Sequence, residues 1–455
     1  MPNVDLVIKG GKIVNVNGIV EADIAIDNEK IIGISKGENG IKGEQTINAK
    51  GKLILPGFID PHVHIFPWGR KARGKAYEVR KSTWETETTS AAFGGVTTLI
   101  DFVLNETNDD PITNIKESID EASSRSIIDF SFHFSIGSKW NESDVKKYIN
   151  NCFKEEIKSI KMYMCYRKEE FMIEDDMIYA AMKYLADKNG IPCIHAENGA
   201  IVELLKNKYS KDGRIEPEKQ LESRPNFIEE EAVSTAIILA KETRVNPYIM
   251  HISTKEGLRA VLDARKKGQT IYLEANPNWT FFNQKDTKKE WPLTRETPPF
   301  RTKEDNEEVL NAIFNGQINT VGSDHSPNTI SMKENGMGGL AGLETTMPIF
   351  YNECTKRGLS PSHVVGITSY NSAKIFGLKG KGSISIGYDA DVILIDPKKE
   401  ITIKADKLHT ECDFTLFENW KIKGMPTTTI RRGEIICDEG EFYGKKGTGK
   451  KIERE

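Results

Sequence analysis

Hydrophobic and polar residues alternate in two different ways between about residues 57 and 375. Short apolar runs rich in β-branched and aromatic residues predict strands. Eight such runs can be located, at 57–64, 97–103, 129–136, 159–166, 191–198, 247–253, 270–277 and 320–326. Between them, segments such as 175–190, 229–244 and 254–268 repeat apolar residues three and four positions apart, which is typical of amphipathic helices. Eight strand and helix units in this order predict an α/β fold, a parallel (β/α)8 TIM barrel whose functional face lies at the carboxyl ends of the strands.

The two ends of the chain show another pattern. Residues 1–56 and 380–440 read as short strands separated by Gly, Asp and Asn, with few helical stretches between them. They predict a small β-sandwich domain formed from both chain termini, next to a barrel domain over residues 57–379. Residues 441–455 end in GKKGTGKKIERE and are polar and rich in Gly and Lys. This composition favours a frayed C-terminal tail over an ordered subunit contact.

Composition narrows the class of partner. The 63 basic and 67 acidic residues nearly balance, so charge gives no signal for nucleic acid or for a membrane surface, and we expect a small-molecule partner. The six cysteines include no CxxC pair, which fits buried, reduced thiols. The sequence opens with a strand pattern instead of a charged leader, and no apolar run approaches the length of a membrane span. We therefore expect a soluble, cytoplasmic protein.

Polar side chains recur near the ends of the predicted strands, where a barrel interior is otherwise apolar. His62 and His64 end the first strand, and their spacing of two residues directs both side chains to the same side. The other groups are Lys161 in the fourth strand, His195 at the end of the fifth, His251 at the end of the sixth and Asp324 at the end of the eighth. Each alone fits a packed histidine, a helix cap or an exposed lysine. Six such groups on the functional rim of one barrel predict an active site.

The residue types predict a metal centre. Four neutral imidazoles and a carboxylate suit a borderline divalent ion such as Zn²⁺. A lysine ammonium cannot bind a metal, but a desolvated neutral amine can add CO2 to form a carbamate, whose two oxygens can bridge two ions. With Lys161 in the set, we expect two divalent ions about 3.5–4 Å apart, an arrangement that polarises an acyl oxygen and supplies a nucleophile at neutral pH.

The motifs around these residues resemble those of the binuclear amidohydrolase superfamily. The HVH pair, the lysine of KMYMCY, the histidines of HAEN and HIS and the aspartate of GSDHSP are similar to its cyclic-amide branch. That branch comprises hydantoinases, dihydropyrimidinases, allantoinases and dihydroorotases. The similarity extends over nearly the whole chain, including GYDADVILIDP in the second terminal region. It implies an enzyme, a cyclic amidase that hydrolyses C–N bonds, and a homotetramer.

The resemblance also implies roles for individual residues. His62, His64 and Asp324 would hold the more buried ion, His195 and His251 the more exposed ion, and a carboxylated Lys161 would bridge both. Asp324 would also take a proton from the attacking water and deliver it to the departing ring nitrogen. Tyr166, five residues after Lys161, would donate a hydrogen bond to the carbonyl oxygen as it becomes an oxyanion. Backbone groups of Thr297 and Gly338 would contact the substrate.

Departures from the family pattern bear on the substrate. Dihydroorotases carry a carboxylate-binding arginine two positions after the HxH pair, where this sequence has Phe66, so an anionic substrate is disfavoured. KMYMCY with Tyr166 favours a hydantoinase or dihydropyrimidinase that opens a hydantoin or dihydropyrimidine ring. GGLAGL and SDHSP resemble allantoinases, which is the main alternative. A non-catalytic dihydropyrimidinase-like protein would lack metal ligands, whereas all six positions are intact here.

Two further histidines stand near the predicted site. His133 alternates with Phe132 and Phe134 along its strand, which favours a packed interior residue over one that lines the pocket. His325 follows Asp324 directly. For His325, a supporting role beside the site and a plain loop position fit equally well.

Overall fold

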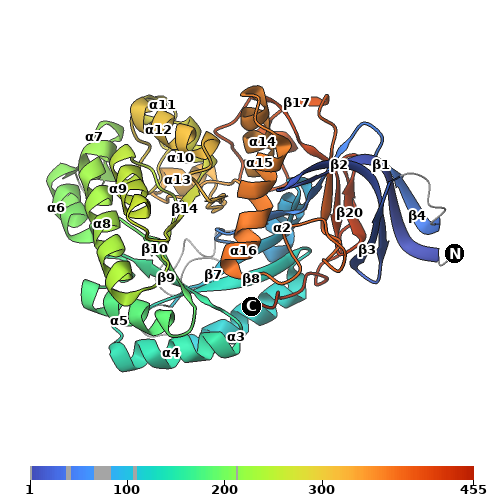
Figure 1. Cartoon of the computed structure of the whole chain (residues 1–455). Helices are drawn as coiled ribbons and strands as arrows, with labels where there is room; N and C mark the ends of the chain where they lie inside the picture. Colours follow the sequence, from blue (N-terminus) through green and yellow to red (C-terminus); the bar gives the residue numbers. More distant parts are fainter. Residues whose placement is uncertain (1–2, 37–41, 66–82, 106–109, 212–213) are drawn as a thin grey trace.

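The structure is a computed structural model that describes residues 3–36, 42–65, 83–105, 110–211 and 214–455. An eight-stranded parallel sheet curls into a nearly closed barrel, and a separate nine-stranded sheet is formed from both ends of the chain (Figure 1). The predicted fold class is confirmed. In Figure 1 the blue and red strands of the second sheet lie side by side, at one flank of the barrel.

All eight predicted strands are present in the barrel sheet, in chain order and parallel. They are β6 (Phe58–Asp60), β7 (Val96–Val103), β8 (Asp129–Ser135), β9 (Ser159–Tyr163), β10 (Ile191–His195), β13 (Tyr248–Ile249), β14 (Tyr272–Ala275) and β15 (Thr320–Val321). Most end earlier than predicted, because the chain leaves the ladder to form the loops that hold the polar side chains. After β6, Pro61 has no N–H to donate, so the HVH pair lies beyond the strand instead of ending it. A single bridge between Val63 and His325 then connects the first and last strands of the barrel.

Helices follow the barrel strands and surround the sheet (Figure 1). They are α2 (Trp84–Phe93), α3 (Pro111–Arg125), α4 (Glu142–Lys154), α5 (Asp175–Ala186), α6 (Gly199–Tyr209), α7 (Pro217–Ser223), α8 (Asn226–Thr243), α9 (Lys255–Lys266), α10 (Pro277–Phe281), α11 (Gln284–Lys289), α12 (Lys303–Phe314), α13 (Ile330–Glu334), α14 (Thr346–Lys356), α15 (Pro361–Val365) and α16 (Asn371–Phe376). The three helices that the apolar spacing predicted are α5, α8 and α9. Thr254 caps α9 by accepting a hydrogen bond from the Gly257 N–H. Among the described helices, none is long and apolar enough to cross a membrane.

The second sheet is hydrogen-bonded in the order β21-β20-β19-β16-β5-β1-β2-β3, with β4 paired to β1. Its strands are β1 (Asn3–Asn15), β2 (Gly18–Asp27), β3 (Lys30–Ser35), β4 (Lys42–Asn48), β5 (Leu53–Pro56), β16 (Val392–Ile395), β19 (Pro426–Arg431), β20 (Glu434–Asp438) and β21 (Glu441–Phe442). β1 changes partner along its length, because residues 3–9 lie parallel to β4 and residues 12–13 parallel to β5. β5 pairs antiparallel with β16, so the two ends of the sequence share one core that includes Ile54 and Leu394. Two short pairs lie outside both sheets, β11 (Ser210–Lys211) with β12 (Arg214–Ile215) and β17 (Glu400–Thr402) with β18 (Lys421–Lys423).

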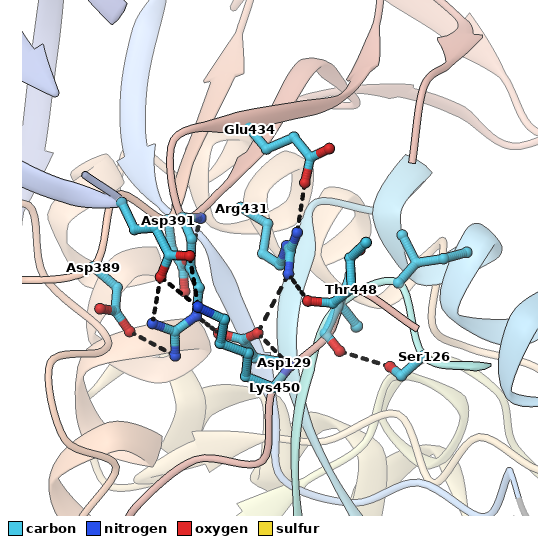
Figure 2. A network of polar contacts seen from close by, with 12 residues as sticks. Ser126, Asp129, Asp389, Asp391, Arg431, Glu434, Thr448 and Lys450 are labelled. Carbon is cyan, nitrogen blue, oxygen red and sulfur yellow. Dashed lines mark hydrogen bonds and ion pairs between the residues drawn. The ribbon is translucent and has the colours of Figure 1, made fainter. Parts of the chain in front are cut away.

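A buried ionic cluster joins this sheet to the barrel (Figure 2). The ammonium of Lys381 lies 2.6 Å from Asp129 at the start of β8, 3.0 Å from Asp389 and 2.5 Å from Asp391. Arg432, between β19 and β20, also pairs with Asp129 and Asp389. The three carboxylates are close enough to hold a metal ion, but the lysine ammonium occupies the space between them. The cluster is therefore a network of ion pairs that connects the second sheet to the barrel.

Residues 441–455 do not form the frayed tail that their composition predicted. Two of them, Ile452 and Arg454, are 3% and 4% exposed, and Lys451 bridges in parallel to Phe130 in β8. The reason lies in the stagger of the barrel, because β9 pairs with β8 only from Phe134 onward and leaves the first residues of β8 available on that side. In Figure 1 the label of the C-terminus lies beside β8.

Candidate active site

A cavity of about 1000 Å³ opens at the carboxyl ends of the barrel strands, the face where barrel enzymes carry their sites. All nine residues predicted for the site line it, namely His62, His64, Lys161, Tyr166, His195, His251, Thr297, Asp324 and Gly338. Phe66, on which the argument against an anionic substrate depends, lies outside the described residues. Tyr166, His251 and Asp324 have positive φ angles of 70°, 33° and 49°. Such backbone conformations cost a non-glycine residue of order 1–3 kcal/mol and cluster at functional sites.

The HVH histidines converge on Asp324. The Nε2 atoms of His62 and His64 each lie 3.1 Å from Asp324 Oδ1, and the two imidazole rings are 5.2 Å apart. Burial alone would raise the pKa of Asp324, but the charge and hydrogen bond of His62 hold it well below its usual value. Burial lowers the pKa of His64 to about 3, so this imidazole is neutral and able to bind a metal.

Lys161 lies between the two groups of histidines. Its side chain is buried, its Nζ contacts the Met250 sulfur at 2.7 Å, and no ion pair joins it to any described residue. The aromatic rings of Tyr163 and Phe102 lie 4.7 and 5.3 Å from Nζ. Burial lowers the pKa of Lys161 to about 8, so a neutral amine is accessible at physiological pH.

His195 and His251 form the other wall. Their rings are 4.6 Å apart, and donor atoms of His62, His251 and Asp324 all lie within 4.8 Å of one another. The ring of Tyr166 lies 5.1 Å from that of His195. Burial raises the pKa of the Tyr166 hydroxyl well above its usual value, so this group stays protonated and can donate a hydrogen bond.

Buried acids behind the histidines were missed from the sequence. Glu274 in β14 accepts from His62 Nδ1 at 2.7 Å and from the His251 N–H at 3.1 Å. In the same way, Glu197 Oε2 lies 2.8 Å from His195 Nε2 and pairs with a buried arginine, Arg224. Such second partners orient a ligating imidazole and fix which nitrogen faces the metal. The available signal was an acidic residue within or just after an apolar strand, where burial without a partner would be costly.

The two predicted backbone contacts already have partners within the protein. The Thr297 N–H donates to the Glu296 carboxylate at 2.9 Å, and the Gly338 carbonyl accepts from the Asn328 side chain. Glu296 also accepts from the Gly339 N–H at 2.7 Å, so its carboxylate connects the two cavity-lining segments that carry Thr297 and Gly338. Burial raises the pKa of Glu296 to about 7.

The two further histidines are both buried. His133 is a packed interior residue, as expected, and it is not among the residues that line the cavity. His325 Nε2 lies 2.9 Å from Glu87, and its backbone carbonyl accepts from the His64 N–H at 2.7 Å. His325 therefore supports the HVH segment from behind.

Residues 53–436 match the model of the amidohydrolase family, and the chain belongs to that family. It is 32% identical to D-hydantoinase of Geobacillus stearothermophilus, over 98% of this chain and 96% of that protein. It is 31% identical to allantoinase of Bacillus licheniformis, over 99% of this chain and the whole of that protein. The solved structure of D-hydantoinase (dihydropyrimidinase) from Thermus sp. superposes with a TM-score of 0.92 at 29% identity, over 99% of both chains. The protein is a cyclic amidohydrolase that resembles D-hydantoinase.

Membership of this family implies a centre of two divalent metal ions, and the donor set fits one. The cavity presents four imidazoles, a carboxylate and a desolvated lysine. Burial lowers the pKa of His64, His195 and His251, whereas at His62 the carboxylates of Asp324 and Glu274 outweigh burial and raise the pKa to about 9. The residues are therefore suited to such a centre.

Proposed function

We propose that the protein opens the ring of a hydantoin or a dihydropyrimidine by hydrolysing its amide C–N bond with the help of two divalent ions, Zn²⁺ in the first instance. The observation that supports this most directly is Lys161. A lysine buried among histidines, with no ion pair to a described residue, is well suited to carry a CO2-derived carbamate, because CO2 adds to the neutral amine.

The ligand assignment follows the two walls of the cavity. His62, His64 and Asp324 would hold one ion, His195 and His251 the other, and carboxylated Lys161 would bridge them. Two ions held in this way would polarise the substrate carbonyl and provide a nucleophile from water at neutral pH. The buried carboxylates Glu274 and Glu197 would keep the imidazoles of His62 and His195 in the orientation that metal binding requires.

Asp324 would move the proton. Its carboxylate faces the cavity, and its side chain is 13% exposed, more than those of His62 and His64. It would accept a proton from the attacking water and deliver it to the ring nitrogen as the C–N bond breaks. Without that delivery the nitrogen would have to leave as an amide anion, which is far less stable.

Tyr166 would orient the substrate carbonyl. Its hydroxyl stays protonated and its ring packs beside His195 on the cavity wall, which suits a donor to an oxygen that gains negative charge. The Gly338 carbonyl can accept a second hydrogen bond from a ring N–H. The Thr297 N–H would have to leave Glu296 to contact substrate, so the Thr297 carbonyl is the more accessible backbone group at that position.

Elemental analysis and a substrate panel test the proposal. We expect close to two divalent metals per chain when metal and bicarbonate are supplied, together with turnover of hydantoin or dihydrouracil. Dihydroorotate, which is anionic, should be a much poorer substrate. A protein that binds one metal or none under these conditions would contradict the two-metal centre.

Allantoin is the second candidate substrate. The allantoinase of Bacillus licheniformis is 31% identical over its whole length, close to the 32% of the D-hydantoinase, and GGLAGLE and SDHSP resemble that group. The same panel decides between the two, because a hydantoinase would prefer hydantoin or dihydrouracil over allantoin.

We also propose that the enzyme is a cytoplasmic homotetramer, by its resemblance to this branch. Light scattering coupled to size-exclusion chromatography would measure the assembly mass. A mass of one or two chains at micromolar concentration would contradict the tetramer.

A further inference from the structure

A chain of hydrogen bonds runs from Arg454 to the segment that carries the HVH pair. The guanidinium of Arg454 donates through Nη1 to Ser159 Oγ at 2.6 Å. Ser159 Oγ lies 2.6 Å from His133 Nδ1, and His133 Nε2 lies 2.8 Å from the carbonyl oxygen of Pro61. Pro61 is joined directly to His62. Arg454, Ser159 and His133 are each at least 96% buried.

The direction of each hydrogen bond is fixed by chemistry. A carbonyl can only accept, so His133 Nε2 carries a hydrogen and donates to Pro61. Burial, with the Arg454 charge nearby, holds the pKa of His133 well below its usual value, so Nδ1 is unprotonated and accepts from the Ser159 hydroxyl. The oxygen of Ser159 is then available to accept from Arg454. All donors therefore point from Arg454 towards the HVH segment.

The backbone around Arg454 is held at the amino ends of the barrel strands. Gly449 N–H donates to Ser126 O at 2.9 Å, and Phe130 exchanges two backbone hydrogen bonds with Lys450 and Ile452, at 3.0 and 2.9 Å. Nearby, Lys450 and Thr448 lie beside the ionic cluster of Asp129 (Figure 2). Ile452 also belongs to one apolar cluster with Ile59 of β6, Ile100 of β7 and Tyr248 of β13, so residues 449–455 cover the floor of the barrel, opposite the cavity.

Burying the charged side chain of Arg454 in the barrel floor costs free energy. Burial lowers its pKa to about 10, so it remains charged at neutral pH, yet no ion pair joins it to any described residue. Its guanidinium also donates to Ser131 Oγ at 2.9 Å and lies 5.7 Å from the centroid of the Phe376 ring, while its Nη2 atom makes no hydrogen bond among the described residues. A buried charge without a counter-ion destabilises a fold. A benefit from Arg454 would therefore have to come from the hydrogen bonds that its guanidinium donates.

We propose that residues 449–455 form the barrel floor and that Arg454 is a positioning residue, which through Ser159 and His133 holds the Pro61 carbonyl and so the backbone of the HVH segment. The benefit to metal binding rests on the proposed function. The effect on the backbone of the HVH segment is independent of the proposed function, because it depends only on hydrogen bonds within the protein.

A matched pair of variants tests the inference. Ser159→Ala and Ser131→Ala each delete one buried hydroxyl that contacts Arg454, but only Ser159 continues to His133. Hydrogen–deuterium exchange of the peptide over residues 58–65 would be measured in the full-length protein, well below its unfolding temperature. We expect exchange about tenfold faster in Ser159→Ala and within twofold of wild type in Ser131→Ala, since loss of a supporting hydrogen bond favours local opening. Arg454→Met should resemble Ser159→Ala, and Arg454→Lys should be intermediate.

Metal release gives a second measurement. With Zn²⁺ loaded, a chelator should remove metal about tenfold faster from Ser159→Ala than from Ser131→Ala, in line with the loss of an outer-shell partner. Equal exchange in the two serine variants would overturn the inference, even if Arg454→Met fails to fold. A wild-type protein that binds no divalent metal would contradict the proposed function, while the exchange data would still decide this inference.

Discussion

Lys381 and Asp129 form a buried ion pair, with Nζ and Oδ2 2.6 Å apart, across the junction between the second sheet and the barrel. Asp389 and Asp391 approach the same ammonium. The attraction of one cation therefore keeps three buried carboxylates together.

The first prediction is that Lys381→Met destabilises the protein strongly. It leaves these carboxylates without their central charge, and removal of one partner from a buried pair costs about 3–5 kcal/mol. Urea denaturation would measure the free energy of unfolding. Lys139→Met, which breaks an exposed pair with Glu170, is the control and should change it by less than about 1 kcal/mol. Equal effects of the two variants would show that the ion-pair network around Lys381 contributes no more to the free energy of unfolding than a surface pair does.

A second prediction concerns pH and Glu296. Burial raises its pKa in the folded protein to about 7, above the ordinary value of 4.5 in the unfolded chain. Between these values the folded state binds a proton that the unfolded state lacks, so this contribution is complete below pH 4.5 and is lost as pH rises through 7. Glu296→Gln removes this contribution, so the stability of the variant relative to wild type should improve from pH 5 to about pH 7 and then level off towards pH 8.

Urea titrations at four pH values would measure this difference, with Glu334→Gln as the control, because Glu334 lines the same cavity but is exposed. A difference between Glu296→Gln and wild type that stays constant over the range would contradict the prediction.

For Lys161, we expect Lys161→Ala to lose metal and nearly all activity, because no carbamate can form. Lys161→Arg should also fail, since a guanidinium does not add CO2. A small carboxylate such as acetate should restore part of both by replacing the carbamate. Metal analysis and turnover are the measurements, and Lys168→Ala, at the exposed rim of the cavity, is the control. Normal metal content in Lys161→Ala would contradict the proposal that carboxylated Lys161 bridges the two ions.

Asp324→Asn separates proton transfer from metal binding. The amide oxygen can still bind a metal, but the side chain cannot carry a proton at neutral pH. Turnover should fall by about 10²–10⁴ while most of the metal remains, as expected when a general acid–base is lost. A turnover within tenfold of wild type would show that a group other than Asp324 transfers the proton.

Tyr166→Phe removes the proposed donor to the oxyanion. Because that bond strengthens in the transition state, kcat should fall by about 10²–10³ with a much smaller change in KM. Tyr179→Phe, on the exposed face of α5, is the control and should behave as wild type. If Tyr166→Phe is harmless and allantoin is the preferred substrate, the hydantoinase assignment is wrong.

The sequence predicted the barrel well because strand and helix periodicities alternate clearly over eight units. It placed residues such as His62 and Asp324 on one rim because parallel strands bring their carboxyl ends to the same side. The supporting acids were missed because a glutamate such as Glu274 shows no partner until the fold brings β14 behind the HVH segment. The burial of Arg454 was missed for a related reason, since composition describes a segment's own chemistry and not the unpaired edge of β8 that it meets.

The pairing of β5 with β16 has a consequence for synthesis on the ribosome. Ile54 and its partner Leu394 lie opposite each other on paired strands, yet 340 positions separate them in the sequence, the difference between their residue numbers. At about 5–20 residues per second, the N-terminal strands would emerge roughly 20–70 s before their partners exist. Through that interval the apolar face of β1 and β5 lacks the strands that cover it, so nascent chains should depend on chaperone protection more than a barrel of the same length with a self-contained N-terminus.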